Sequence, residues 1–436
     1  MIQALRLQPE WCQQFLINGT LKEEAMSDRQ SIEDWLNMSP AYYPGSGWKV
    51  LLWSLPTLTI LSWLLFLWGP LPYWPAVTFS LIQLTITGNQ SKKINARHSL
   101  ISKRADTLKK YYNLIALFLA NTFQEKGLIK LQQTVKIQEG ANNGFKRLLQ
   151  LISALENRLN FLMNIILNGL LLWDLNCLYR IERWMATFKS QFPKWIQTSS
   201  FLDSLISLAV FNFNHPDYTT PDIQEKSDHS DFLLDIRHGR HPLLYPEASI
   251  PNHLYQPATL NLFLITGANM AGKSTFLRMV GLNMILAMAG ANVAAQRMVM
   301  TPVSLFTSMR TSDSLFSHSS FFHAELKKLQ WIMEQVRAKK PVYIMLDEIL
   351  KGTNSKDQHL GAAALISKII SLGGRGLIAT HDIELTQLAQ QFPEKLKNIA
   401  FEIELEGDKM VFNYQYKDGV CQNMNASILM KQMGII

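Results

Sequence analysis

A glycine-rich segment stands between an apolar run and a helical pattern in the C-terminal half of the chain. Residues 262–266 are apolar enough for a buried strand, and residues 275–288 have the spacing of a helix. Between them, residues 267–274 read Gly-Ala-Asn-Met-Ala-Gly-Lys-Ser, which matches the pattern G-x-x-x-x-G-K-[ST]. Glycines allow the backbone to wrap around phosphate groups, so that N–H groups and the helix N-terminus face the negative charge. The strand, loop and helix together predict a phosphate-binding loop.

Two further apolar runs extend this reading to a whole domain. Residues 341–346 and 376–380 are short and apolar, and helical stretches separate them. Strands that alternate with helices are typical of a parallel sheet. We therefore predict an α/β P-loop NTPase fold for residues 226–436.

Polar residues follow these strands in an order that suits nucleotide hydrolysis. Lys273 is expected on the β- and γ-phosphates of ATP, and Ser274 on Mg²⁺. Asp347 is expected to hold Mg²⁺ through water, and Glu348 to polarise the attacking water. His381 is placed to contact the γ-phosphate. The alternatives are a simple glycine turn, a solvated acidic strand end and a structural histidine.

These segments resemble the MutS family of DNA mismatch repair ATPases, from about Ser204 to residue 436. Residues 266–278 carry the Asn-Met pair that other P-loop families lack. The remaining similar segments are the Walker B strand and its loop at 347–357, the histidine motif at 379–381, and the lead-in segments at 239–242 and 251–252.

The resemblance implies a composite site in a homodimer, with ATP and Mg²⁺ bound. Ser320 aligns with the serine that reaches the partner's nucleotide, although a capped helix start explains it equally well. Tyr414 stands where the family has a base-stacking histidine. The implied nucleotide-binding residues are Gly267, Asn269, Met270, Ala271, Gly272, Lys273, Ser274, Thr275, Ser320 and Tyr414, with Ser274 and Asp347 for the metal and Glu348 and His381 for catalysis.

Several positions depart from the family pattern. Leu350 and Lys351 replace the usual Gly and Arg after Asp-Glu-Ile, and His318 and Ser319 replace the Gly and Arg before the trans serine. The aromatic residue expected before the Pro-Asn pair is absent, because Ser249 and Ile250 stand there. These changes bear on the rate and on activation by the partner more than on ATP binding.

No charged residue occurs between Lys49 and Lys92. Residues 50–68 are long enough to cross a hydrocarbon core of ~30 Å, and a Gly-Pro-rich turn leads into a second apolar run at 71–86. Aromatic residues gather near the ends of both runs, as interfacial aromatics do. The pattern predicts a transmembrane hairpin in contact with lipid, the alternative being a helical hairpin buried in a soluble core.

Basic residues flank this hairpin. Lys49 precedes it, and Lys92, Lys93 and Arg97 follow it. Two spans return the chain to its starting side, and cytoplasmic flanks collect Lys and Arg. We therefore expect a protein of a bacterial-type inner membrane with its ATPase domain in the cytoplasm.

The rest of the N-terminal half is predicted to be helical. Residues 1–48 form a polar helical segment, 49–91 the hairpin, and 92–225 a helical region like the MutS core and lever. Residues 159–173 carry no charge. A buried helix is favoured over a third membrane segment here, because Asn160, Asn164 and Asn168 are costly in lipid.

The net charge of the chain does not decide which polyanionic partner it binds. The net charge of +8 suits either nucleic acid or anionic lipid. Cys12, Cys177 and Cys421 are far apart, which argues against a disulfide framework or a zinc site.

Three functions follow from the resemblance and the hairpin. The first is a membrane-tethered ATPase coupled to mismatched or branched double-stranded DNA, held by Lys and Arg at 102–110 and by Lys146, Arg147 and Arg158. The second is a mechanochemical ATPase that acts on a membrane or protein partner. The third is a nucleotide switch with little turnover.

Overall fold

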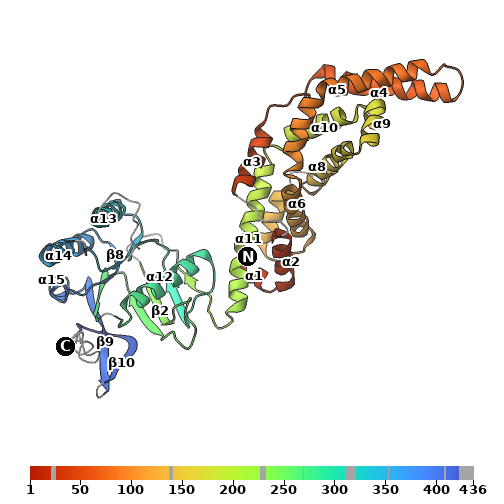
Figure 1. The fold of residues 1–436 in the computed structure, drawn as a ribbon. Helices are drawn as coiled ribbons and strands as arrows, with labels where there is room; N and C mark the ends of the chain where they lie inside the picture. The colour runs from red at the N-terminus through yellow and green to blue at the C-terminus, as the bar shows by residue number, and fades with distance from the viewer. Residues whose placement is uncertain are drawn as a thin grey trace. The chain divides into compact units, whose positions relative to one another are not determined.

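The computed structural model describes residues 1–20, 26–136, 141–225, 232–268, 270–309, 321–351, 353–406 and 409–421 (Figure 1). The chain forms two compact units, Met1–Phe213 and Asn214–Ile436. The first is helical and the second is α/β, as the sequence predicts.

The first unit is built from helices of very different polarity. Its helices are α1 (Ile2–Arg6), α2 (Pro9–Thr20), α3 (Met26–Asn37), α4 (Ser46–Leu67), α5 (Trp74–Ser102), α6 (Ala105–Ala120), α7 (Lys126–Lys136), α8 (Ala141–Glu156), α9 (Phe161–Leu171), α10 (Trp173–Phe188) and α11 (Phe192–Asn214), with the 3₁₀ turn η1 (Asn157–Leu159) before α9. Aromatic side chains fill the centre, where the Phe145 ring lies 4.8 Å from that of Trp195 and 5.2 Å from that of Phe192. Such rings bury large apolar areas, so they hold α8 against α11.

A buried carboxylate fixes the chain before α4. Glu182 of α10 accepts hydrogen bonds from the backbone N–H groups of Ala41, Tyr42 and Tyr43 at 2.8–3.0 Å. Arg97 of α5 pairs with the same carboxylate at 3.0 Å. Arg97 therefore has a structural role in this unit.

Helices α4 and α5 form the expected hairpin and run side by side (Figure 1). Trp63 Nε1 donates to Ser80 Oγ at 3.1 Å across the pair. Among single helices of the described residues, α4 alone is long and apolar enough to cross a membrane. Helix α5 does not pass this test of length and composition, so only one of the two predicted spans meets it, and the transmembrane hairpin stays a prediction. The bent pair of α9 and α10 counts as one further candidate, with an angle of 75° at its break.

Helix α9 corrects the expectation of a buried helix at residues 159–173 in its N-terminal half, whereas Asn168, Gly169 and Leu172 at its C-terminal end are buried. Leu159 and Phe161 are each 74% exposed, and Leu162 is 67% exposed. Asn160 and Asn164 use their polar groups within α9, whereas Asn168 is buried and its Oδ1 also accepts from the Asp174 N–H of α10 at 3.0 Å. Asn160 caps the helix by accepting from the Met163 N–H, and Asn164 and Asn168 bond to each other.

The second unit contains two sheets. The larger has the order β10-β9-β4-β8-β7-β6, parallel except for the β9–β10 pair. Its strands are β4 (Leu262–Gly267), β6 (Ser304–Ser308), β7 (Val342–Asp347), β8 (Arg375–Ala379), β9 (Leu396–Glu406) and β10 (Lys409–Asp418). The smaller sheet has the order β1-β5-β2-β3, from β1 (Asp222–Ile223), β2 (Leu234–Gly239), β3 (Asn252–Gln256) and β5 (Arg297–Met300).

Two apolar clusters cover the larger sheet. One contains α12 (Lys273–Ala289), and the other contains α13 (Phe321–Arg337) and α14 (Ser355–Ser371). Two short turns, η3 (Glu384–Gln387) and α15 (Leu388–Gln391), lead from β8 to β9. Strands β4 and β7 are buried at every residue, as expected for parallel strands covered on both faces.

The boundary between the units lies after Phe213, earlier than the predicted boundary at residue 226. Strand β1 pairs with β5, and Thr219 Oγ1 donates to Ala295 O at 2.7 Å. These contacts tie residues 214–225 to the α/β unit.

Candidate nucleotide-binding site

The glycine-rich loop connects β4 to α12, as the sequence predicts. A Cβ on Gly267 would lie 2.4 Å from the carbonyl oxygen of Phe401, so only glycine fits there. Gly272 precedes α12 with a φ of +110°, and no side chain caps the helix. The N–H groups of its first turn are therefore available to an anion at the loop.

The Lys273 amine lies inside the loop. Its Nζ donates to the carbonyl oxygens of Gly267 at 2.7 Å and Ala268 at 2.9 Å. The side chain is buried, with 5% exposed. The loop thus holds a positive charge where the glycines open the backbone.

Ser274 and Asp347 meet, although 73 positions separate them in the sequence. Ser274 Oγ donates to Asp347 Oδ2 at 2.6 Å. Asp347 Oδ1 is buried and has no hydrogen-bond partner among the described residues. A hydroxyl beside an unused carboxylate oxygen is a hard-oxygen donor set, so this pair fits Mg²⁺.

Glu348 is buried directly after β7, with its N–H donating to Ala379 O at 2.9 Å and a φ of +55°. His381 Nε2 contacts one of its carboxylate oxygens and Lys351 Nζ contacts the other. The two predicted catalytic residues therefore touch each other. Their roles stay predictions.

Burial lowers the pKa of His381 to about 4, and the neighbouring Lys273 and Lys351 charges add to the effect. His381 is therefore neutral at pH 7. Because its pKa is lower in the folded state, its contribution to stability is complete above about pH 6.5 and falls as the pH drops toward 4.

We therefore expect the wild-type chain to lose more unfolding free energy than His381→Asn when the pH is lowered from 7 to 5. Asparagine does not titrate, so the part of the loss that comes from protonation of His381 is absent in the variant. Urea unfolding at both pH values measures it. Equal losses in the two proteins would contradict the lowered pKa.

Tyr414 lies beside the loop. A Cβ on Gly272 would be 3.2 Å from its ring, and the side chain is 42% exposed. Asn252 holds this part of β10, because its amide donates to Tyr414 O at 2.9 Å and accepts from the Tyr416 N–H at 3.3 Å. The ring therefore lies beside the loop, and its stacking on the base stays a prediction. The resemblance gave no role to Asn252.

The other predicted residues differ in exposure. Met270 is 76% exposed, Thr275 is exposed and Ala271 is buried. Asn269 and Ser320 lie outside the described residues. The proposed nucleotide and trans contacts of those two stay predictions.

Two contacts were missed from the sequence. Lys351 was noted only as a departure, yet it pairs with Glu348. Glu325 of α13 accepts from the Leu350 N–H at 2.7 Å and holds the loop after β7. Glu348 and Lys351 are three positions apart in the sequence, and this spacing could have indicated that their side chains pair.

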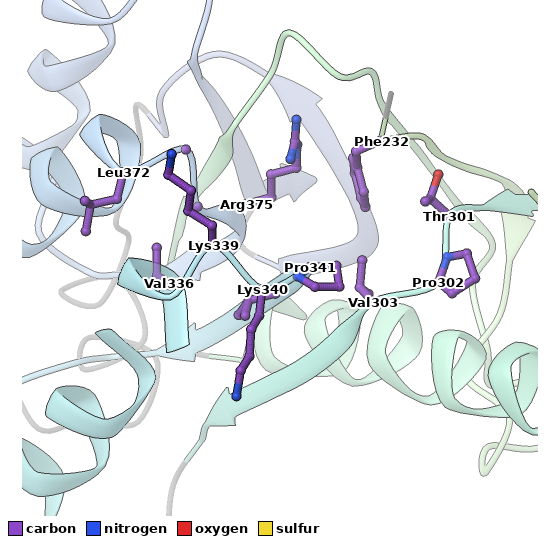
Figure 2. Close-up of a pocket in the computed structure, with 13 residues that line it drawn as sticks. Phe232, Thr301, Pro302, Val303, Val336, Lys339, Lys340, Pro341, Leu372 and Arg375 are labelled. Atoms are coloured by element: carbon purple, nitrogen blue, oxygen red, sulfur yellow. The ribbon is translucent and has the colours of Figure 1, made fainter. Parts of the chain in front are cut away.

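A separate pocket of about 380 Å³ lies at the opposite ends of the strands (Figure 2). Residues at the starts of β7 and β8 line it, and the Arg375 guanidinium lies 5.1 Å from the centre of the Phe232 ring. The glycine loop follows the carboxyl end of β4, so this pocket is no part of the nucleotide site.

The comparisons with known proteins agree with this geometry. Residues 263–433 match the family model of MutS domain V. The C-terminal region is thus similar to MutS domain V. The chain is 36% identical over 227 residues to the DNA mismatch repair protein MutS of Thermotoga neapolitana, covering 50% of this chain and 26% of that protein.

Two other relatives give the same picture. The MutS protein of Thermotoga maritima is 32% identical over 54% of this chain and 29% of its own length. The DNA mismatch repair protein MSH4 of Arabidopsis thaliana is 30% identical over 52% of this chain and 29% of its own. The match thus spans between a quarter and a third of each relative, and it supports membership of the MutS family.

Proposed function

We propose that this chain is a membrane-anchored, MutS-like ATPase that hydrolyses Mg-ATP and couples hydrolysis to DNA binding. The contact between Ser274 and Asp347 carries the proposal, because it joins the glycine loop to the end of β7. A P-loop NTPase needs its metal between these two residues. The domain V match supports the same reading.

In the proposed mechanism, Lys273 binds the β- and γ-phosphates, and Ser274 and Asp347 hold Mg²⁺. Mg²⁺ held by these two residues would neutralise charge that develops on the phosphates. Glu348 takes a proton from the attacking water, since its carboxylate lies at the site and the neutral His381 beside it can hydrogen-bond. The Tyr414 ring stacks on the base.

The dimer follows from the resemblance to MutS, with Ser320 completing the partner's site. Membrane anchoring is supported by α4, which has 22 residues and a mostly exposed apolar surface. Helix α5 packs along it and completes the hairpin, so both flanks and the ATPase domain lie on the cytoplasmic side.

Double-stranded DNA is the proposed coupled partner. Lys103 and Lys109 are exposed, as are Lys146 and Arg147 on α8. Arg158 is no longer proposed to contact DNA. Its guanidinium pairs with the Asp174 carboxylate at 3.2 Å, and its side chain is only 11% exposed.

The test is the ATPase rate of the detergent-purified full chain with and without heteroduplex DNA. We expect stimulation by DNA that declines with added salt, since phosphate contacts release counterions. Hydrolysis that DNA leaves unchanged, but lipid vesicles stimulate, would favour the second candidate, an ATPase acting on a membrane or protein partner. The exposed apolar surface of α4 is the observation that favours this second candidate function.

The third candidate function is a nucleotide switch with little turnover. The contact of Lys351 with Glu348 is the observation that favours it. An amine on the proposed base hinders its approach to water. We expect Lys351→Met to raise the basal ATPase rate roughly two- to fivefold, because the lysine of the pair is 41% exposed and solvent screening limits its effect on Glu348 to ~0.4–1 kcal/mol. The matched control is Lys356→Met, an exposed lysine on α14. A rate that falls in Lys351→Met alone would show that the lysine assists hydrolysis.

A further inference from the structure

Helix α9 presents a surface that the proposed membrane anchor does not explain. We propose that α9 is embedded in lipid beside α4 and α5, as a short helix that enters and leaves the bilayer on the same side. This inference rests on the proposed membrane anchoring and adds a third lipid-contacting element to it.

The apolar surface of α9 continues that of the hairpin. A Cβ on Gly169 would lie 3.6 Å from Leu84 of α5, so the C-terminal half of α9 packs closely on the hairpin. The N-terminal half projects from this contact with its apolar side chains exposed. The exposed set is Leu159, Phe161, Leu162, Met163, Ile165 and Ile166 on α9 and its entry turn, and Leu58, Ile60, Leu61, Leu64, Leu81 and Ile82 on the hairpin.

Lipid is the occupant that fits this surface. No charged residue occurs from 159 to 173, and none occurs from 50 to 91. Exposed apolar patches of this extent mark interaction sites, and a protein partner adds polar rim contacts that an uncharged surface does not offer. The absence of charge on both segments favours hydrocarbon.

Side chains satisfy the backbone polar groups at the break after α9, as a lipid environment without water requires. In lipid every backbone polar group must be satisfied within the protein. Gln83 of α5 is fully buried, accepts from the Leu172 N–H at 2.9 Å and donates to Thr59 of α4 at 2.5 Å. Asn176 donates to Leu171 O at 2.7 Å. Side chains thus replace water at the point where the helix stops.

The two ends of the uncharged segment lie together. Arg158 before α9 pairs with Asp174 after it at 3.2 Å. Helix α9 has 11 residues, or roughly 16 Å, about half of the hydrocarbon thickness. It then turns by 75° into α10. A segment with paired ends and half the needed length returns to the side that it entered.

Nitroxide labels on single introduced cysteines test the depth of α9. The full chain is placed in vesicles of phosphatidylcholine and phosphatidylglycerol, with labels at Ile166→Cys on α9, Leu61→Cys on α4 and Ser200→Cys on the exposed surface of α11. The three native cysteines are buried, and the parent chain gives the background. Collisions with oxygen report lipid, and collisions with a water-soluble nickel chelate report water.

We expect the labels at 166 and 61 to collide with oxygen and to be protected several-fold from nickel relative to 200. A water-exposed 166 beside a lipid-exposed 61 would overturn the embedded α9 and leave the anchor standing. Water exposure at both positions would overturn the anchor as well.

Labelling of Glu156→Cys and Arg180→Cys in intact spheroplasts tests the return to one side. Both positions are exposed and flank the uncharged segment. We expect an impermeant thiol reagent to miss both until the cells are opened. Reaction at only one would mean that the segment spans the membrane. Reaction at both would support the return but reverse the proposed orientation of the anchor.

Discussion

Replacing Glu348 with glutamine is expected to lower the ATPase rate about 10²- to 10⁴-fold, the usual contribution of a general base. Glutamine has nearly the same shape but accepts no proton from water. ATP binding should persist, because Lys273 and the glycine loop bind the phosphates. Phosphate release under saturating ATP and binding of a fluorescent ATP analogue measure the two effects separately.

The matched control is Glu334→Gln, which removes the same charge from an exposed position on α13. Its rate should equal that of the wild type. A Glu348→Gln chain that keeps its rate would place the base elsewhere. Loss of both hydrolysis and binding would instead make Glu348 a structural residue of the loop after β7.

Replacing Gly376 with alanine is expected to unfold the α/β unit. A Cβ at this position would lie 1.9 Å from the backbone oxygen of Ile344. Strand β8 lies between β4 and β7 in the sheet, so the neighbouring backbone has no room to move. The expected loss is more than about 4 kcal/mol of unfolding free energy, the range that a severe core clash reaches.

Hydrogen exchange of the amides in β4, β7 and β8 measures this loss within the α/β unit. Gly19→Ala on α2 is the control, because a Cβ there meets no atom within 4 Å. The exchange rates of Gly19→Ala should match those of the wild type. Wild-type exchange in Gly376→Ala would mean that β8 shifts to accept the methyl group.

The sequence alone was enough to predict the nucleotide loop and the α/β fold. A phosphate-binding loop uses consecutive residues, so residues 267–274 carry its pattern in one stretch. The carboxyl ends of parallel strands meet at one edge of the sheet, which is why residues after β7 and β8 were expected beside the loop.

The sequence was less informative about the helical unit. It predicted the hairpin of α4 and α5, because an uncharged stretch is visible in the sequence. It misjudged residues 159–173, since the cost of three asparagines depends on whether their polar groups find partners. Asn160 and Asn164 find them within α9, and Asn168 also accepts from the Asp174 N–H of α10.

The local sequence thus determined which chemistry is proposed for this protein and which elements carry the proposed residues. Only the tertiary structure decided that Lys351 contacts the proposed base, that His381 is neutral, that Asp174 engages Arg158 and that the N-terminal half of α9 is exposed. The physical reason is that burial and pairing arise between segments far apart in the chain. Desolvation and ion pairing depend on distances that no local pattern encodes.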